Sequence, residues 1–321
     1  MNECTSRDMS ELTFKTRMSH LAFDIADQAA RQLLSHVDRT EILRLRHVPV
    51  ERIAKHLGVR VKISAPNSSP WAMHGLEGQA KVSNQLSLNE MSNDEYLVQL
   101  FAYSGMINAR TRFTLAHELS HVIVNIILEN GKLSLPNTEV EAICNMVAAN
   151  VLLPDYLIIE LFSDNNNLSI SLDLLMDMCK RAGVSLSVAI NRLQNILMKK
   201  GIDVSNGAML VATERSRKRD INMAPRIIAR CLPAEWYLPS NKRLSTIGMS
   251  MLAEMFYRKP LFTRFTVNEQ IKMWNIKEKH TSLVKSHITS ICYRISNSKT
   301  FEGSGYEAPR IMLSIMDFAP S

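Results

Sequence analysis

The chain of 321 residues lacks any apolar run long enough to cross a membrane. Its longest apolar stretches, such as VIVNIIL at 122–128, are far shorter than the about 20 residues that a membrane-spanning helix needs. The opening stretch MNECTSRDMSELTFK mixes acidic, basic and polar side chains and has no apolar centre, which is not the pattern of a secretory signal. We therefore expect a cytoplasmic protein with no membrane partner.

Cysteine is also scarce, and the five cysteines show no C-x-x-C spacing. An odd, scattered set is typical of reduced thiols and excludes both a disulfide framework and a thiolate metal cage. The set comprises Cys4, Cys144, Cys179, Cys231 and Cys292. The chain also lacks internal repeats and long low-complexity tracts. Its length, with 46% hydrophobic and 21% charged residues, predicts two or three globular units.

Positive charge is unevenly distributed along the chain. Residues 1–200 hold 20 Lys and Arg against 21 Asp and Glu, whereas residues 201–321 hold 18 against 10. All of the net charge of +7 therefore belongs to the last third. This asymmetry suggests a separate C-terminal domain with its own kind of partner, although a solvated basic surface explains it equally well.

The chain reads as an α+β protein with four segments. After a flexible tail at 1–20, periodicity predicts a helix at 21–35, a short helix at 50–57 and strands at 59–64 and 80–90. A buried helix follows from Thr111 to a left-handed stop at Asn130-Gly131, with an apolar stripe. The stripe comprises Ala116, Leu119, Val122, Ile123, Ile126 and Ile127.

A second helix is capped by Asn137 or Thr138 and ends at Pro154. Residues 171–197 then form a helix, a turn at Gly183 and another helix, which resembles a helix-turn-helix. The C-terminal part predicts strands at 207–215, 225–232 and 309–318 and one helix at 243–257. Its aromatic residues Trp236, Tyr237 and Trp274 belong to the core or to a ligand pocket, and the core is favoured.

The stretch RTRFTLAHELSHVIVN at 110–125 contains an arrangement that is typical of a catalytic metal site. His117 and His121 are four residues apart, so a helix presents both imidazoles on one face, as a zinc ion requires. Glu118 is turned about 100° from His117, so it can reach a water on the metal rather than the metal itself. This pattern predicts one zinc per chain, with Glu118 as the general base.

A catalytic zinc needs a third protein ligand. Glu129 lies too far along the same helix, and Glu139 points elsewhere on the next one. Glu141 is favoured, because an antiparallel return brings it beside the histidines, with Asn145 one turn later as a supporting residue. Thr138 and Glu141 also match a helix capping box, so Glu141 could serve only as a cap.

These motifs together are similar to the ImmA/IrrE metallopeptidases, whose pattern is RxxFTLAHELGH followed by ExxANxFAAxLLMP. The match covers about residues 40–200 and includes RTRFTLAHELSH, EAICNMVAANVLLP and the helix-turn-helix. The chain departs from it at a few positions and carries an added stretch at 91–105, which puts the usual shape of the substrate cleft in doubt. The departures are Ser120 for Gly, Cys144 for Ala, Val147 for Phe and Leu153 for Met.

The resemblance implies a gluzincin-like zinc endopeptidase with His117, His121 and Glu141 as ligands and Glu118 as catalytic residue. Its expected substrate is a helix-turn-helix repressor, whose cleavage derepresses stress-response or mobile-element genes. The implied domains are a mainly helical, zincin-like metallopeptidase domain with a small sheet at 21–158, the helix-turn-helix segment at 159–204 and an α+β domain at 205–321, regulatory by analogy. Tyr156 is one candidate for stabilising the oxyanion. The alternative is a non-proteolytic DNA-binding regulator that uses the helix-turn-helix and the basic C-terminal part.

Overall fold

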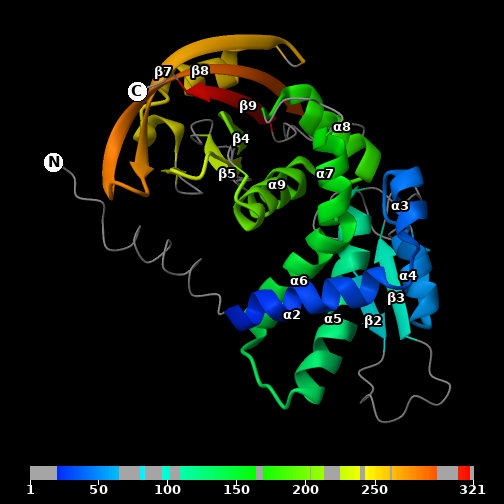
Figure 1. Ribbon diagram of the computed structural model, residues 1–321. Coiled ribbons are helices and arrows are strands. Elements are labelled where there is room, and N and C mark those ends of the chain that lie inside the picture. Colours follow the sequence, from blue (N-terminus) through cyan, green and yellow to red (C-terminus); the bar gives the residue numbers. More distant parts are fainter. Residues whose placement is uncertain are drawn as a thin grey trace. The chain divides into compact units, whose positions relative to one another are not determined.

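The computed structural model describes ten stretches of the chain: 20–64, 80–83, 96–101, 109–163, 169–202, 204–212, 225–238, 243–260, 262–294 and 310–318. They form two compact units, Met1–Ile158 with Lys180–Ser185, and Ile159–Cys179 with Leu186–Ser321. Apart from His20, the expected tail lies outside the described residues, as do most of the strand expected at 80–90 and the basic run RSRKRD at 215–220. Both units combine helices and strands, which confirms the α+β class (Figure 1).

The first unit is built from helices around a small sheet. Its elements are α2 (His20–Leu34), α3 (Arg39–Leu45), α4 (Val50–His56), β1 (Val59–Ser64), β2 (Ala80–Ser83), β3 (Tyr96–Phe101), α5 (Ala109–Asn130), α6 (Asn137–Leu152) and the start of α7 (Asp155–Ser163). The alanine-rich face of α2 packs across α5 and α6. Ala22, Ala26 and Ala29 on that face are fully buried, and small side chains allow the helices to approach closely.

The three-stranded sheet has the order β1-β3-β2, with β3 in the middle. β3 runs parallel to β1 and antiparallel to β2, and Val98 at its centre pairs with both Val61 and Val82. The stretch at 91–105, expected as an addition to the family pattern, contains the strand that joins the other two. The sequence analysis did not recognise YLVQLF as a strand.

Arg112 fastens the start of α5 to the elements around it. Its guanidinium donates a hydrogen bond to the carbonyl oxygen of Val48 at 2.7 Å and lies 3.9 Å from Glu51. Gly183, in the left-handed region at φ +63°, packs so closely that an added Cβ would lie 3.1 Å from Arg112 Nε. Burial lowers the pKa of Arg112, and the charge of Glu51 opposes that shift. These contacts make Arg112 a packing residue of the first unit.

The second unit contains a six-stranded antiparallel sheet in the order β5-β4-β9-β8-β7-β6. Its elements are the end of α7, most of α8 (Leu172–Ala182), α9 (Leu186–Lys200), β4 (Asn206–Ala212), β5 (Arg226–Cys231), β6 (Trp236–Tyr237), the 3-10 turn η1 (Leu244–Ile247), α10 (Ser250–Arg258), β7 (Arg264–Asn275), β8 (His280–Arg294) and β9 (Arg310–Phe318). Helix α9 packs against β4 and β5 (Figure 1). Helix α10 packs against β7.

The long hairpin of β7 and β8 was missed from the sequence. Twelve residue pairs join the strands, from Arg264↔Ile291 to Asn275↔His280. β7 alternates buried and exposed residues, but two inward positions of β8 are serines, Ser286 and Ser290, which hide the apolar period of a strand. Ser290 is satisfied by the buried hydroxyl of Ser314 at 2.8 Å.

One predicted helix of this unit is in fact two short elements. Gly248 adopts φ +89° between η1 and α10, and an added Cβ there would lie 2.5 Å from the carbonyl oxygen of Gln270. The helix expected at 243–257 is therefore broken by a left-handed glycine. Trp236 packs against the buried hydrophobic core of the second unit, as the sequence analysis favoured over a ligand pocket. Among the described residues, no helix combines the length and the apolar character that a membrane span requires.

Candidate metal centre

Helix α5 presents two histidines at the edge of its buried face. The residues of α5 that are buried are Thr111, Leu115, Ala116, Leu119, Ser120, Ile123, Val124 and Leu128. The stripe expected from the sequence is correct for Ala116, Leu119 and Ile123, whereas Val122, Ile126 and Ile127 are only half-buried. His117 and His121 lie beside this face, and their side chains are 15% and 27% exposed. A small molecule can therefore reach both imidazoles.

The chain reverses direction between α5 and α6 through a left-handed helix end. The left-handed residue is Lys132 at φ +50°, one position after the glycine that the sequence suggested. The amides of Lys132 and Leu133 donate to the carbonyl oxygens of Glu129 and Leu128, at 3.0 and 2.9 Å. These two bonds form a Schellman motif, which turns the chain so that α6 packs against α5.

Helix α6 begins at Asn137, and its N-cap is Pro136, which makes no side-chain capping bond. Thr138 is therefore already inside the helix, so the capping box expected from Thr138 and Glu141 does not exist. The expected caps at Asn137 and Thr138 were wrong because Pro136 ends the preceding loop one residue earlier. Glu141 therefore does not cap the helix, which was the structural alternative to metal binding for this residue.

The ligand atoms of His117, His121 and Glu141 converge on one point. All three lie within 4.8 Å of one another. The two Nε2 atoms are 3.0 Å apart, and the carboxylate oxygens of Glu141 lie 3.2 Å from Nε2 of His117 and 3.4 Å from Nε2 of His121. The imidazole planes meet at 79°, so the rings approach edge to face rather than stacking.

These separations agree with those of a tetrahedral zinc site. Ligand atoms about 2.0–2.1 Å from an ion at tetrahedral angles lie about 3.3–3.4 Å from one another. The observed separations of 3.0, 3.2 and 3.4 Å equal that value or fall a few tenths of an ångström below it. Two imidazole nitrogens and a carboxylate are also the donors of a common catalytic zinc site. The three side chains therefore fit a zinc ion, and the partial exposure of the site leaves one side open.

Glu118 follows the first histidine and lies within electrostatic reach of the site. Burial raises the pKa of its carboxyl; the charge of His117 opposes this shift, and the charge of Glu141 adds to it. The pKa of His121 is lowered, first by burial and then by His117, while Glu141 opposes the shift. Since a metal binds the neutral imidazole, the lowered pKa of His121 favours its role as a ligand.

The supporting residue expected from the sequence is not the one that the structure provides. Among the described residues Asn145 is exposed and makes no hydrogen bond to either histidine. Cys144 Sγ instead lies 3.4 Å from Nδ1 of His121. Cys144 is fully buried, and burial together with Glu141 and Glu118 raises the pKa of its thiol to about 12. The sequence held a signal for this contact, because residues three apart share a helix face and Cys144 follows Glu141 by three.

The other candidates lie elsewhere or do not take part. Glu129 and Glu139 are absent from the convergent group. The ring of Tyr156 lies under the guanidinium of Arg39 at 4.8 Å. Burial raises the pKa of Tyr156 and Arg39 opposes that shift, with neither site carboxylate contributing. Tyr156 therefore has no visible link to the metal centre, whereas the ring of Phe113 stacks beside His117 at 6.5 Å.

Comparisons with known proteins extend the description of the fold only. No family model matches the chain, and no curated protein matches it. Among solved structures, a Mycobacterium tuberculosis transcriptional regulator has a similar fold, with a TM-score of 0.51 and 13% sequence identity. The similarity covers 92% of this chain and 76% of that chain. At this identity it speaks for a shared fold and not for a shared activity.

Proposed function

We propose that the chain is a zinc-dependent endopeptidase, with a zincin-like metallopeptidase domain in its first unit. The observation that carries this proposal is the convergence of Nε2 of His117, Nε2 of His121 and the carboxylate of Glu141, with Glu118 beside them. An H-E-x-x-H helix with a third ligand on a packed neighbouring helix is an arrangement that supports peptide hydrolysis. The sequence resemblance to the ImmA/IrrE metallopeptidases supports the same activity.

Each residue has a distinct part in the proposed reaction. His117, His121 and Glu141 would hold the ion, and when bound the zinc supplies Lewis acidity toward a water molecule and a peptide carbonyl. The carboxylate of Glu118 takes a proton from the attacking water and returns it to the nitrogen of the leaving amine. A raised pKa suits this role, because the carboxyl then returns a proton more readily at neutral pH.

The substrate class follows from the resemblance and is compatible with the sheet. A helix-turn-helix transcriptional repressor is the proposed substrate, and its cleavage would derepress stress-response or mobile-element genes. The sheet ends in β2, a strand of four residues that pairs on one side with β3 and packs near α5. An extended segment of substrate could add to such an edge as a further strand, using its backbone groups.

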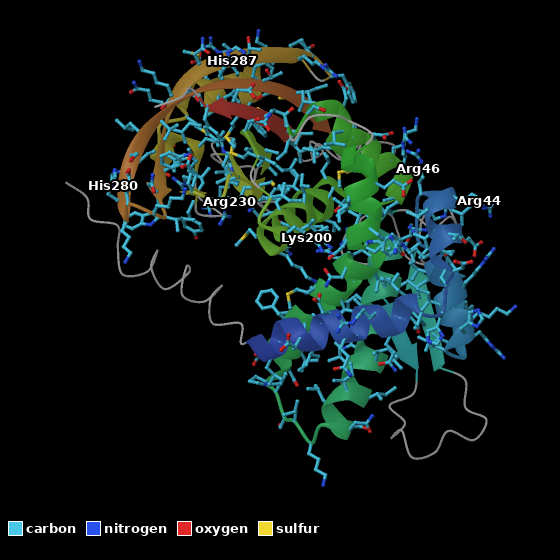
Figure 2. The ribbon with its side chains drawn as sticks, viewed as in Figure 1. Arg44, Arg46, Lys200, Arg230, His280 and His287 are labelled. Atoms are coloured by element: carbon cyan, nitrogen blue, oxygen red, sulfur yellow. The ribbon has the colours of Figure 1, made fainter. Side chains whose placement is uncertain are left out.

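The alternative function is DNA-binding regulation through α8 and α9, and the contacts of α9 weigh against it. It packs against β4 and β5 and buries six of its fifteen residues, among them Arg192, which is 4% exposed. The remaining basic residues of α9, Lys199 and Lys200, lie in its last turn, and Figure 2 labels Lys200 there. A helix that reads the major groove needs base-contacting residues along a free face.

A cleavage assay tests the proposal. The purified chain, loaded with one equivalent of zinc, is incubated with the helix-turn-helix repressor encoded beside its gene, and the products are measured by intact-mass spectrometry. We expect one or a few discrete cuts, loss of cleavage with a chelator, and recovery when zinc is returned. The matched control is Glu118→Gln, which should bind zinc but leave the repressor intact. Equal cleavage by wild type and Glu118→Gln would refute the assignment of the general base.

A further inference from the structure

Helix α6 contacts both ring nitrogens of His121. Glu141 Oε1 lies 3.4 Å from Nε2, and Cys144 Sγ lies 3.4 Å from Nδ1. Because Glu141 and Cys144 are three residues apart, they project from the same face of α6 and enclose the imidazole between them. A metal-ligating histidine ordinarily donates a hydrogen bond from its second ring nitrogen to a carboxylate, a carbonyl or a water. At His121 a thiol sulfur occupies that place.

The two histidines differ in this respect. Nδ1 of His117 is buried and has no hydrogen-bond partner in the described part of the chain. A buried N–H without a partner is rarer in proteins than an unused acceptor, so His117 carries its hydrogen on Nε2 in the metal-free chain. Nε2 of His117 lies 3.0 Å from Nε2 of His121 and 3.2 Å from Oε2 of Glu141, so its hydrogen has an acceptor at the site. At His121, Nδ1 faces Cys144 Sγ at 3.4 Å, where a hydrogen on Nδ1 meets an acceptor.

We propose that Cys144 is a positioning residue that holds His121 in the tautomer with hydrogen on Nδ1, so that the Nε2 lone pair faces the metal position. The sulfur accepts the Nδ1 hydrogen, weakly but in a fully buried place. Cys144 is neither a ligand nor a nucleophile, because its sulfur lies on the side of the ring opposite Nε2. His121 is thus preset for metal, whereas His117 must change its tautomer before it can bind.

Nuclear magnetic resonance of the ring nitrogens tests the tautomer without metal and without activity. Long-range ¹H–¹⁵N spectra of the metal-free full chain above pH 8 report which nitrogen of His121 carries hydrogen. In wild type and Cys144→Ser we expect the Nδ1–H form to predominate. In Cys144→Ala the ratio of the Nδ1–H form to the Nε2–H form of His121 should fall about twofold to tenfold, the change in an equilibrium constant that the loss of one hydrogen bond causes. Val147→Ala, equally buried on α6, should leave it unchanged. An unchanged ratio in Cys144→Ala, or an equal fall in Val147→Ala, would overturn the proposal.

Zinc affinity, measured by competition with a chromogenic chelator, tests whether Cys144 helps His121 to bind the metal. This second test rests on the proposed function. Cys144→Ala should bind zinc about tenfold more weakly, and Cys144→Ser should recover most of the loss, because its oxygen still accepts the hydrogen. Equal affinity in all variants would overturn the role of Cys144 while zinc binding itself stood. A wild type that binds no zinc would overturn the proposed function, and the tautomer spectra would still decide the role of Cys144.

Discussion

Replacing Glu141 by glutamine should remove most of the stabilisation that zinc gives to the fold. In wild type, zinc at 100 times its Kd stabilises the native state by about 2.7 kcal/mol. For a unit of this size each kcal/mol raises the Tm by about 2–4 °C, so zinc should raise it by about 5–11 °C. If loss of the carboxylate weakens binding about 100-fold, the same zinc concentration equals the new Kd and contributes about 0.4 kcal/mol. The Tm should then rise by only about 1–2 °C.

Differential scanning calorimetry with and without zinc measures these shifts. Without zinc the substitution should change the Tm little, because the carboxylate is 56% exposed and exposed ion pairs contribute about 0–1 kcal/mol. Glu139→Gln is the matched control, since it makes the same change of charge on the same helix outside the convergent group. It should keep the full zinc shift. A wild-type shift in Glu141→Gln, or a lost shift in Glu139→Gln, would refute the assignment of the third ligand.

Three further predictions concern single groups. Because the pKa of Glu118 is raised in the folded state, ionisation of its carboxyl at neutral pH opposes folding. Metal-free Glu118→Gln should therefore unfold at a higher urea concentration than wild type at pH 7. The difference between the two urea midpoints should disappear as the pH falls below about 4, where the carboxyl is protonated in both states. Gly248→Ala should destabilise the second unit by at least about 1–3 kcal/mol in urea melts, since its Cβ would lie 2.5 Å from the Gln270 oxygen at φ +89°; an unchanged midpoint would contradict the geometry. Ser290→Ala leaves the buried hydroxyl of Ser314 unpaired and should lower the free energy of unfolding by about 1–3 kcal/mol. The double variant Ser290→Ala with Ser314→Ala should lose less than the sum of the two single variants. Strictly additive losses would argue against the Ser290–Ser314 hydrogen bond.

Four helices of the first unit, α2, α4, α5 and α6, could be predicted because their signals are local, whereas α3 was missed. The period of apolar residues, the stop signals at Gly131 and Pro154, and the spacing of His117 and His121 predict these helices and place the two imidazoles on one face. Glu141 could be favoured but not fixed, since its alternative as a cap depended on where α6 begins. That start is decided by Pro136, which takes the N-cap position one residue before the caps expected from propensity.

The remaining features depend on contacts between distant residues. β3 pairs with strands on both sides, and nothing local in YLVQLF tells which neighbours it will have. β8 carries Ser286 and Ser290 inward, where a strand pattern expects apolar side chains, and Ser290 is tolerated because Ser314 lies opposite. Cys144 could be noticed as a departure from the family pattern, but its contact with His121 needs both helices in place.

Zinc K-edge X-ray absorption of the zinc-loaded full chain tests the metal centre most directly. The account predicts one zinc per chain, bound by two imidazole nitrogens and oxygen donors at about 2.0–2.1 Å, with no sulfur at about 2.3 Å. His117→Ala and Glu141→Ala should each lose this signal. A chain that retains no zinc after loading, or a spectrum with sulfur among the ligands, would contradict the claim that His117, His121 and Glu141 form the site.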